Sequence, residues 1–170
     1  GNAIVTTLQS NMGLDSSLAA DGVKVYRSGI GDRLVMREML EHGCNIGGEN
    51  SGHFIFSDVS PCGDGLAAAL SVLSVAVASG KKLSQLRGGI KMYPTASEAL
   101  SVERKTPIAE TANLSAAIKK CEDILSGEGR ILVRYSGTEK KIRLLAEGEN
   151  AQKVAECMQI LKRAVELDLK

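Results

Sequence analysis

The stretch GRILVRYSGTEKKIRLL, residues 129–145, contains two short apolar runs that are joined by a polar connection. Residues 131–133 and 142–145 are rich in β-branched and aliphatic side chains, which favours two strands of one small sheet. A tight hairpin needs only a turn residue or two, yet this connection holds an arginine, two hydroxyl residues and a glycine. The surplus of hydrogen-bond donors indicates that the connection binds something.

The donors in this connection are those that suit a phosphate group. Arg134 supplies a planar fork of N–H groups, and Ser136 and Thr138 supply hydroxyls. Gly137 permits a backbone conformation in which successive N–H groups form an anion-binding nest. Arg143, on the following strand, can reach the same anion. The alternative is a polar loop whose serine and threonine bond to their own backbone, and for this stretch alone that alternative is favoured.

Outward from the hairpin, the second half of the chain is predicted to be a small α+β domain. Residues 112–125 and 151–167 have helical periodicity, and residues 91–105 are extended and contain a proline. We therefore expect a small sheet with its helices on one side.

The first half alternates predicted strands and helices, which indicates an α/β domain with a βαβ layer. Strands are expected at residues 3–8, 23–26 and 53–56, and helices at 14–20, 32–41, 64–79 and 83–87. Asp32 and Asp64 are expected to cap two of the helices. The helix after Asp64 is apolar nearly all round, so we expect it to be buried. A domain boundary is expected near residues 88–91, which gives domains 1–89 and 90–170.

A second polar motif, GGENSGH at residues 47–53, precedes the predicted strand 53–56. If the segment is extended, Glu49, Ser51 and His53 project to one side. A carboxylate beside a serine can accept from the vicinal hydroxyls of a sugar, and His53 can exchange protons near neutral pH. The alternative is a glycine-rich turn with a capping glutamate, and this stretch alone supports the two interpretations equally.

A third motif, Gly31-Asp32-Arg33, stands at a predicted helix start. Helix N-termini attract anions, and Arg33 would strengthen that attraction. The alternative, a simple Asp32 cap with a solvated Arg33, is at least as well supported. The stretch Gly63-Asp64-Gly65 is interpreted as a structural turn and cap.

Composition excludes several classes of partner. The formal net charge of +1 and the 44% hydrophobic content give no support to a nucleic-acid surface or a membrane contact, and no apolar run is long enough to cross a bilayer. The scattered cysteines, Cys44, Cys62, Cys121 and Cys157, form no CxxC pair. They predict reduced thiols, buried or half-buried, in a cytoplasmic protein, and no metal-ligand spacing is evident.

In combination, the motifs resemble the α-D-phosphohexomutase superfamily. TTLQSNMGL, GIGDRLV, GGENSGHFIF, GDGLAAALSVLSV and GRILVRYSGTEKKIRLL follow the family's order along essentially the whole chain. Asp32 with its neighbours, and Asn50 in the sugar loop, look more like the family's glucosamine enzymes than its phosphomannomutase/phosphoglucomutase branch. Tyr135 and Lys140 stand where prolines are common in the family, which leaves the stiffness of the loop open.

The resemblance implies that the chain corresponds to domains 3 and 4 of a four-domain enzyme, the fourth domain being TATA-binding-protein-like. It implies a catalytic role for His53 and sugar binding by Glu49, Ser51, Gly31, Asp32 and Arg33. It implies phosphate binding by Arg134, Ser136, Gly137, Thr138 and Arg143.

The resemblance also implies what the intact enzyme does. It would interconvert glucosamine 6-phosphate and glucosamine 1-phosphate through a phosphoserine and a bisphosphate intermediate, and so feed UDP-N-acetylglucosamine and peptidoglycan precursor synthesis. The phosphoserine and the Asp-x-Asp-x-Asp-Arg loop that holds Mg²⁺ belong to the family's first two domains. We therefore expect no metal ligand in this chain and no turnover by it alone. Glucose or mannose phosphates as substrates, a non-catalytic phosphosugar-binding module and a homodimer stay open.

Overall fold

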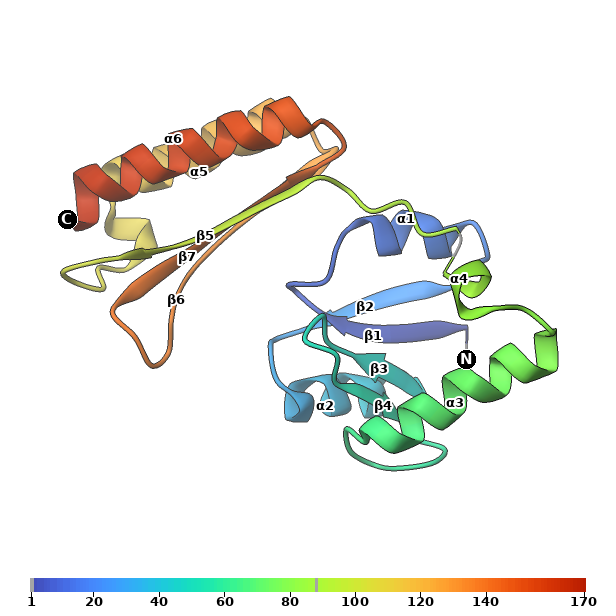
Figure 1. Cartoon of the computed structure of the whole chain (residues 1–170). Helices are drawn as coiled ribbons and strands as arrows, with labels where there is room; N and C mark the ends of the chain where they lie inside the picture. Colours follow the sequence, from blue (N-terminus) through green and yellow to red (C-terminus); the bar gives the residue numbers. More distant parts are fainter. Residues whose placement is uncertain (1, 88) are drawn as a thin grey trace. The chain divides into compact units, whose positions relative to one another are not determined.

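The computed structural model describes residues 2–87 and 89–170, which divide into two compact units, one ending at Met92 and one running from Tyr93 to Lys170 (Figure 1). The domain boundary expected after Gly89 stays a prediction, and Gly88, beside it, lies outside the described residues. Among the residues described, no helix is both long and apolar enough to cross a bilayer.

The first unit is built on a four-stranded sheet with the strand order β2–β1–β3–β4. Its elements are β1 (Ala3–Thr7), α1 (Gly13–Ala19), β2 (Lys24–Ser28), α2 (Asp32–His42), β3 (Ile46–Gly48), β4 (Phe54–Phe56), α3 (Gly65–Ser79) and α4 (Leu83–Leu86). β1, β2 and β3 run parallel, and β4 is antiparallel to β3. The predicted βαβ layer is confirmed, whereas β3 was not predicted, because three residues of which two are glycine carry no alternation signal.

Helix α2 covers one face of this sheet. Val35 and Met39 of α2 are each 1% exposed, and they pack with Val5 of β1. Gly47 in β3 makes this close packing possible, because a Cβ there would lie 2.4 Å from the Met39 sulfur. The result is a rigid base for the polar loop that follows β3.

The start of α2 differs from the prediction. Asp32 is the first residue of the helix, the N-cap is Gly31, and no side-chain cap bond forms. The prediction that Asp32 caps the helix is therefore wrong; a carboxyl oxygen of Asp32 instead lies within 4.8 Å of one of Glu49. The predicted stop at Gly43 is confirmed, with a left-handed φ of 64° that suits glycine.

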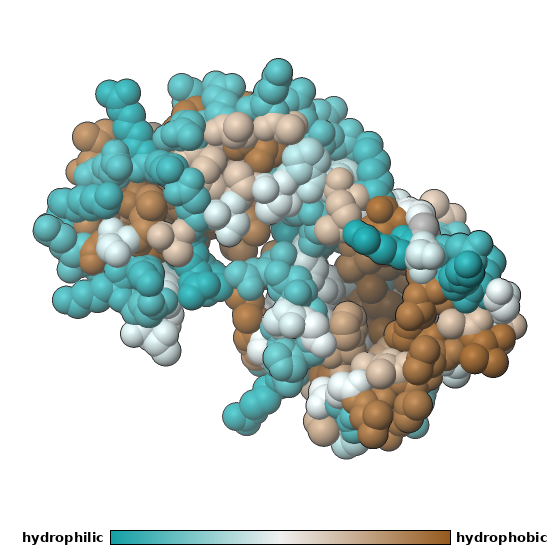
Figure 2. Space-filling view, viewed as in Figure 1, coloured by the Kyte–Doolittle hydropathy of each residue, from teal (hydrophilic) through white to brown (hydrophobic). Residues whose placement is uncertain are grey.

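Helix α3 is capped as predicted but is not buried. The Asp64 carboxylate accepts from the backbone N–H groups of Leu66 and Ala67 at 2.9 Å. Leu66 is nevertheless 72% exposed and Val77 83% exposed, and Figure 2 shows a hydrophobic surface where α3 lies. The predicted burial is wrong because burial requires a facing apolar surface, and β4, which α3 contacts, has only three residues.

The second unit has a three-stranded antiparallel sheet with the order β5–β7–β6. Its elements are β5 (Thr95–Ser101), a 3-10 turn (Ile108–Glu110), α5 (Ala112–Leu125), β6 (Gly129–Tyr135), β7 (Lys141–Gly148) and α6 (Ala151–Leu169). Figure 1 shows α5 and α6 side by side on one face of the sheet, which confirms the predicted α+β layout.

The core of the second unit includes two of the thiols. Cys121 and Cys157, both fully buried, contact each other's backbone carbonyls, with Sγ–O distances of 3.6 and 3.7 Å. All four cysteines are free, as predicted; Cys44 is also buried, whereas Cys62 is exposed, so the predicted burial is wrong for Cys62. Burial and then the neighbouring thiol raise the pKa of Cys121 to about 12, so it stays protonated and unreactive.

Candidate functional site

In the first unit, the polar loops gather at the carboxyl ends of the parallel strands. Residues 29–32 follow β2, and the loop of residues 49–53 follows β3. Ligands of open α/β sheets bind at this edge, because the loops from neighbouring strands meet there. Two of the three motifs singled out in the sequence therefore belong to one place.

The loop at residues 49–53 is a tight hairpin turn. The Glu49 N–H donates to the His53 carbonyl at 2.9 Å, and the Gly52 N–H donates to the Glu49 carbonyl at 3.1 Å. Gly52 has a φ of 96°, which favours glycine. The extended segment assumed in the sequence prediction is therefore wrong. The turn still brings Ser51 and His53 together, since the Ser51 Oγ lies 3.0 Å from the His53 Nδ1.

Asp32, Glu49 and His53 form a compact polar cluster. Each offers one ligand atom, and these atoms all lie within 4.8 Å of one another. The Glu49 carboxyl group is close enough to Asp32 and to the Gly31 N–H for both to shift its pKa. Gly31 has a φ of 119°, a conformation that L side chains rarely adopt. The structure thus unites Gly31 and Asp32 with the 49–53 loop.

The cluster perturbs Glu49. Burial raises the pKa of the Glu49 carboxyl group most, and the neighbouring Asp32 raises it further, while the Gly31 N–H and His53 oppose the shift. Two carboxyl groups this close attract donors such as sugar hydroxyls, which would relieve their mutual repulsion. The cluster is therefore suited to binding a polyhydroxyl ligand.

Two neighbours of the cluster depart from expectation. Arg33 is exposed and, with Ile30 and Arg37, lines a hollow that adjoins the cluster through Gly31 and Asp32. Gly63, interpreted as part of a turn, lies beside the cluster, because a Cβ there would be 3.3 Å from the Asp32 Oδ2. No local sequence pattern indicates this contact, since the two residues are distant along the chain.

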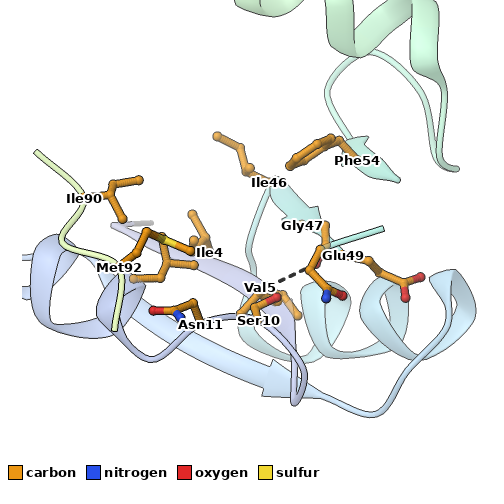
Figure 3. A pocket seen from close by; sticks show the side chains of 14 residues that line it. Ile4, Val5, Ser10, Asn11, Ile46, Gly47, Glu49, Phe54, Ile90 and Met92 are labelled. Atoms are coloured by element: carbon orange, nitrogen blue, oxygen red, sulfur yellow. Dashed lines mark hydrogen bonds between the residues drawn. The ribbon is translucent and has the colours of Figure 1, made fainter. Parts of the chain in front are cut away.

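An apolar cavity of about 290 Å³ adjoins the same loop. Ile4, Ile46, Phe54 and Met92 surround it, and Glu49 lies at its rim with the carboxylate directed away from them (Figure 3). These residues come from several separate segments, so no local pattern predicts the cavity. It bounds the polar cluster on one side with a hydrophobic wall.

In the second unit, the hairpin of β6 and β7 places two arginines opposite each other. Arg134 and Arg143 are register partners in the antiparallel ladder. Burial lowers the pKa of Arg134, and the charge of Arg143 lowers it further. Like charges directly opposite destabilise a strand pair. An anion held by both guanidinium groups would remove that cost.

The connection at residues 136–140 uses its polar groups in two ways. Ser136 is 4% exposed, its N–H donates to the Lys141 carbonyl at 2.8 Å, and its Oγ accepts from the Glu139 N–H at 3.3 Å. The serine therefore does satisfy the loop's own backbone, as the alternative interpretation expected. A hydroxyl that accepts can still donate its hydrogen to an anion, and Gly137 and Thr138 are exposed.

The backbone of Gly137 bears on the predicted nest. It is not among the glycines with a positive φ, so any anion-binding nest here would have to form without a left-handed glycine, and the nest stays a prediction. The donors that do not depend on it are the guanidinium groups, the hydroxyls and ordinary backbone N–H groups.

Sequence reasoning missed three contacts around this connection. The Glu139 carboxylate pairs with Lys141 at 2.5 Å and with Arg143 at 3.6 Å. The Lys105 Nζ donates to the Ser136 carbonyl at 2.6 Å. Lys105 belongs to the segment after β5, and no sequence pattern links it to the hairpin.

Comparisons with known families match both units. The model of "Phosphoglucomutase/phosphomannomutase, alpha/beta/alpha domain III" matches residues 1–93, and that of the "Phosphoglucomutase/phosphomannomutase, C-terminal domain" matches residues 74–164.

Curated relatives extend this similarity. The phosphoglucosamine mutase of Nitratidesulfovibrio vulgaris (strain DP4) is 41% identical over 170 residues, which is 100% of this chain and 38% of the relative. The phosphoglucosamine mutase of Anaeromyxobacter dehalogenans (strain 2CP-C) is 46% identical over 150 residues, 88% of this chain and 33% of the relative. The chain thus spans less than half the length of these relatives.

Solved structures agree on the fold. The N-acetylphosphoglucosamine mutase of Aspergillus fumigatus has a TM-score of 0.77 at 16% identity, covering 98% of this chain and 38% of that one. The same enzyme in complex with GlcNAc-6P and magnesium has a TM-score of 0.74 at 17% identity, covering 96% and 38%.

Proposed function

The chain belongs to the phosphoglucomutase/phosphomannomutase family, as its motifs predicted, and we propose that it is the phosphosugar-binding part of a phosphoglucosamine mutase. The whole enzyme would interconvert glucosamine 6-phosphate and glucosamine 1-phosphate in the cytoplasm. The relatives at 41–46% identity carry that name, which favours glucosamine over glucose or mannose.

The opposed pair of Arg134 and Arg143 is the observation that carries this proposal. Two guanidinium groups in register repel each other, and the exposed Glu139 carboxylate offsets only part of that by its contact with Arg143 at 3.6 Å. A sugar phosphate is a divalent anion that both arginines could bind. Ser136 and Thr138 add hydroxyl donors in the same loop. We assign to these groups the phosphate that is not being transferred.

The cluster in the first unit would bind the sugar. Glu49 and Asp32 would accept hydrogen bonds from sugar hydroxyls, with Ser51 beside them. His53, whose ring bonds to Ser51, would exchange a proton or stabilise charge near the reacting phosphate. Phosphoryl transfer depends mainly on positioning and charge stabilisation, so these contacts would control the rate.

The magnesium of the family does not fit this cluster. Mg²⁺ prefers oxygen ligands in near-octahedral geometry. Here one of the three donors is the imidazole nitrogen of His53, and only two are carboxyl oxygens. We therefore assign Mg²⁺ and the phosphoserine to the rest of the enzyme and derive no step from them here.

Calorimetric titration of the chain tests the proposal. Glucosamine 6-phosphate should bind, unphosphorylated glucosamine should bind far more weakly, and Arg134→Ala should weaken phosphosugar binding. Arg163→Ala, an exposed arginine on α6, is the charge-matched control and should leave affinity unchanged. Equal affinity for both sugars, or an unaffected Arg134→Ala variant, would refute the phosphate site.

Turnover by the full-length enzyme decides the substrate. Glucosamine phosphates should be the best substrates, ahead of glucose and mannose phosphates. The chain alone should show no turnover. Preference for mannose or glucose phosphate would overturn the substrate assignment and leave the phosphate site standing.

A further inference from the structure

The segment that follows β5 is tied to the β6–β7 connection at both of its ends. The Val102 N–H donates to the Lys140 carbonyl at 3.0 Å, at the end of the connection. Near its beginning, the Lys105 Nζ donates to the Ser136 carbonyl at 2.6 Å. The Tyr135 hydroxyl donates to the Thr106 carbonyl, also at 2.6 Å.

These contacts matter because little else fixes the connection. Gly137 and Thr138 are exposed, and Gly137 has no left-handed conformation that would enforce a particular turn. The described contacts of the loop with itself and its strand ends are the bonds of Ser136 to Lys141 and Glu139 and the ion pairs of the exposed Glu139 with Lys141 and Arg143. A loop with few internal contacts samples several conformations and pays for ordering when it binds a ligand.

The bond from Lys105 also acts electronically. A charged donor makes a shorter and stronger hydrogen bond than a neutral one. The carbonyl of Ser136 and the N–H of Gly137 belong to the same peptide group. Hydrogen bonds in series polarise one another, so an ammonium group on that carbonyl makes the Gly137 N–H a better donor to an anion.

We propose that Lys105 and Tyr135 are positioning residues for phosphate binding: Lys105 orients and polarises the Ser136–Gly137 peptide group, and Tyr135 anchors the segment that carries Lys105. Neither residue is assigned a contact with substrate. This inference rests on the proposed phosphate site, and it extends that site to a segment that carries none of the sequence motifs.

The variants Lys105→Met, Lys105→Arg and Tyr135→Phe test the proposal in the whole chain. Lys105 is exposed, so methionine should be tolerated, and phenylalanine keeps the Tyr135 ring. Lys162→Met is the matched control, because Lys162 makes an ion pair with Glu98 at 2.9 Å, away from the connection. Urea unfolding of each variant would verify that the fold is intact.

Two measurements separate positioning from plain stability. Lys105→Met should weaken glucosamine 6-phosphate binding about tenfold, the effect of losing one charge-assisted bond. Lys105→Arg should recover most of the affinity, Tyr135→Phe should weaken it less than Lys105→Met, and Lys162→Met should not change it. In the ligand-free chain, the Gly137 amide proton should move upfield in Lys105→Met only.

The outcomes distinguish this inference from the proposed function. If the unmodified chain binds the phosphosugar and Lys105→Met binds equally well, the positioning role is overturned and the phosphate site stands. If the unmodified chain does not bind the phosphosugar, the proposed function fails, and the Gly137 resonance still decides whether Lys105 polarises the peptide group. An unchanged Gly137 resonance in Lys105→Met overturns the inference.

Discussion

Replacing Arg143 by glutamine should have opposite effects on stability and on binding. In the ligand-free chain, Arg143 faces Arg134 across the ladder, and cross-strand pairs change stability by about 0.2–1 kcal/mol, with like charges unfavourable. Arg143 also contacts Glu139 at 3.6 Å, but both partners are exposed, and Lys141 can keep that carboxylate. Arg143→Gln should therefore leave the second unit equally stable or stabilise it by about 0.2–1 kcal/mol.

Phosphosugar binding should suffer in the same variant. A hydrogen bond to a charged partner contributes about 1.5–3 kcal/mol, which corresponds to roughly a 10- to 150-fold loss of affinity. The glutamine amide keeps one neutral donor, so we expect the lower half of that range. A site built from two like charges lowers the stability of the ligand-free chain and raises its affinity for an anion. Removing one charge should therefore change stability and affinity in opposite directions.

Native-state amide exchange measures the stability of the second unit alone. Ile142 and Leu144 are buried in β7, and their exchange should report opening of that sheet. Without phosphosugar, the protection of these two amides from exchange in Arg143→Gln should equal or exceed that in the parent. When glucosamine 6-phosphate is added, the protection should increase more in the parent than in the variant. Arg163→Gln is the control. Lower protection without ligand, together with unchanged affinity, would show that Arg143 is an ordinary surface residue of the hairpin.

Three further predictions concern other parts of the chain. A thiol reagent should label the exposed Cys62 in the native chain and should reach Cys121 only on unfolding. The reason is that Cys121 is buried, which raises the pKa of its thiol to about 12. Rapid labelling of both cysteines in the native chain would contradict the packing. Asp168→Ala should cost about 1 kcal/mol, since the Asp168 carboxylate accepts from the Leu114 N–H at the start of α5 as a helix cap does. The hydrogen bond from Asn113 is the main cause that lowers the pKa of Asp168 below its ordinary value of 3.8. The stabilisation is therefore complete above that pH and is lost as the pH falls through the lowered pKa. In urea unfolding, a difference from the parent that does not shrink as the pH is lowered would argue against the cap. Gly137→Ala should change unfolding stability by less than about 0.5 kcal/mol, because a Cβ there meets nothing within 4 Å, so any loss of phosphosugar affinity would indicate close approach of the ligand.

Elements governed by local chemistry were predicted well. Helix α5 spans Ala112–Leu125, as its helical periodicity indicated. The start of α3 follows from the Asp64 carboxylate, and the end of α2 follows from a glycine that accepts a positive φ. In each case the side chain and the backbone group it serves are within a few residues, so the pattern is visible in the sequence.

The polar cluster of the first unit was predicted in composition but not in geometry. Glu49 and His53 meet because a turn pairs them, whereas the sequence suggested an extended segment. Asp32 forms no cap bond, and its carboxyl group lies within 4.8 Å of the ligand atoms of Glu49 and His53. That proximity depends on how two loops are placed in the fold, and the sequence of neither loop specifies it.

The exposure of helix α3 could not be predicted from its composition. Its composition indicates a preference for an apolar environment, and composition is all that the sequence supplies. Burial depends on the area of the facing element, and β4 is three residues long. The exposed side chains of Leu66 and Val77 therefore reflect the surroundings of the helix and not an error in assigning it.

The phosphate site depends on strand register, which composition leaves undetermined. The residues of the connection indicate an anion, but only the pairing of Arg134 with Arg143 brings the two guanidinium groups together. A slip of one residue would turn every side chain of β7 to the other face and separate them. The ladders of β7 with β6 and with β5 hold the register, and the bond of the Ser136 N–H to the Lys141 carbonyl continues it into the connection. The proposed phosphate site therefore depends on contacts that hold this end of the hairpin as well as on the arginines that would bind phosphate.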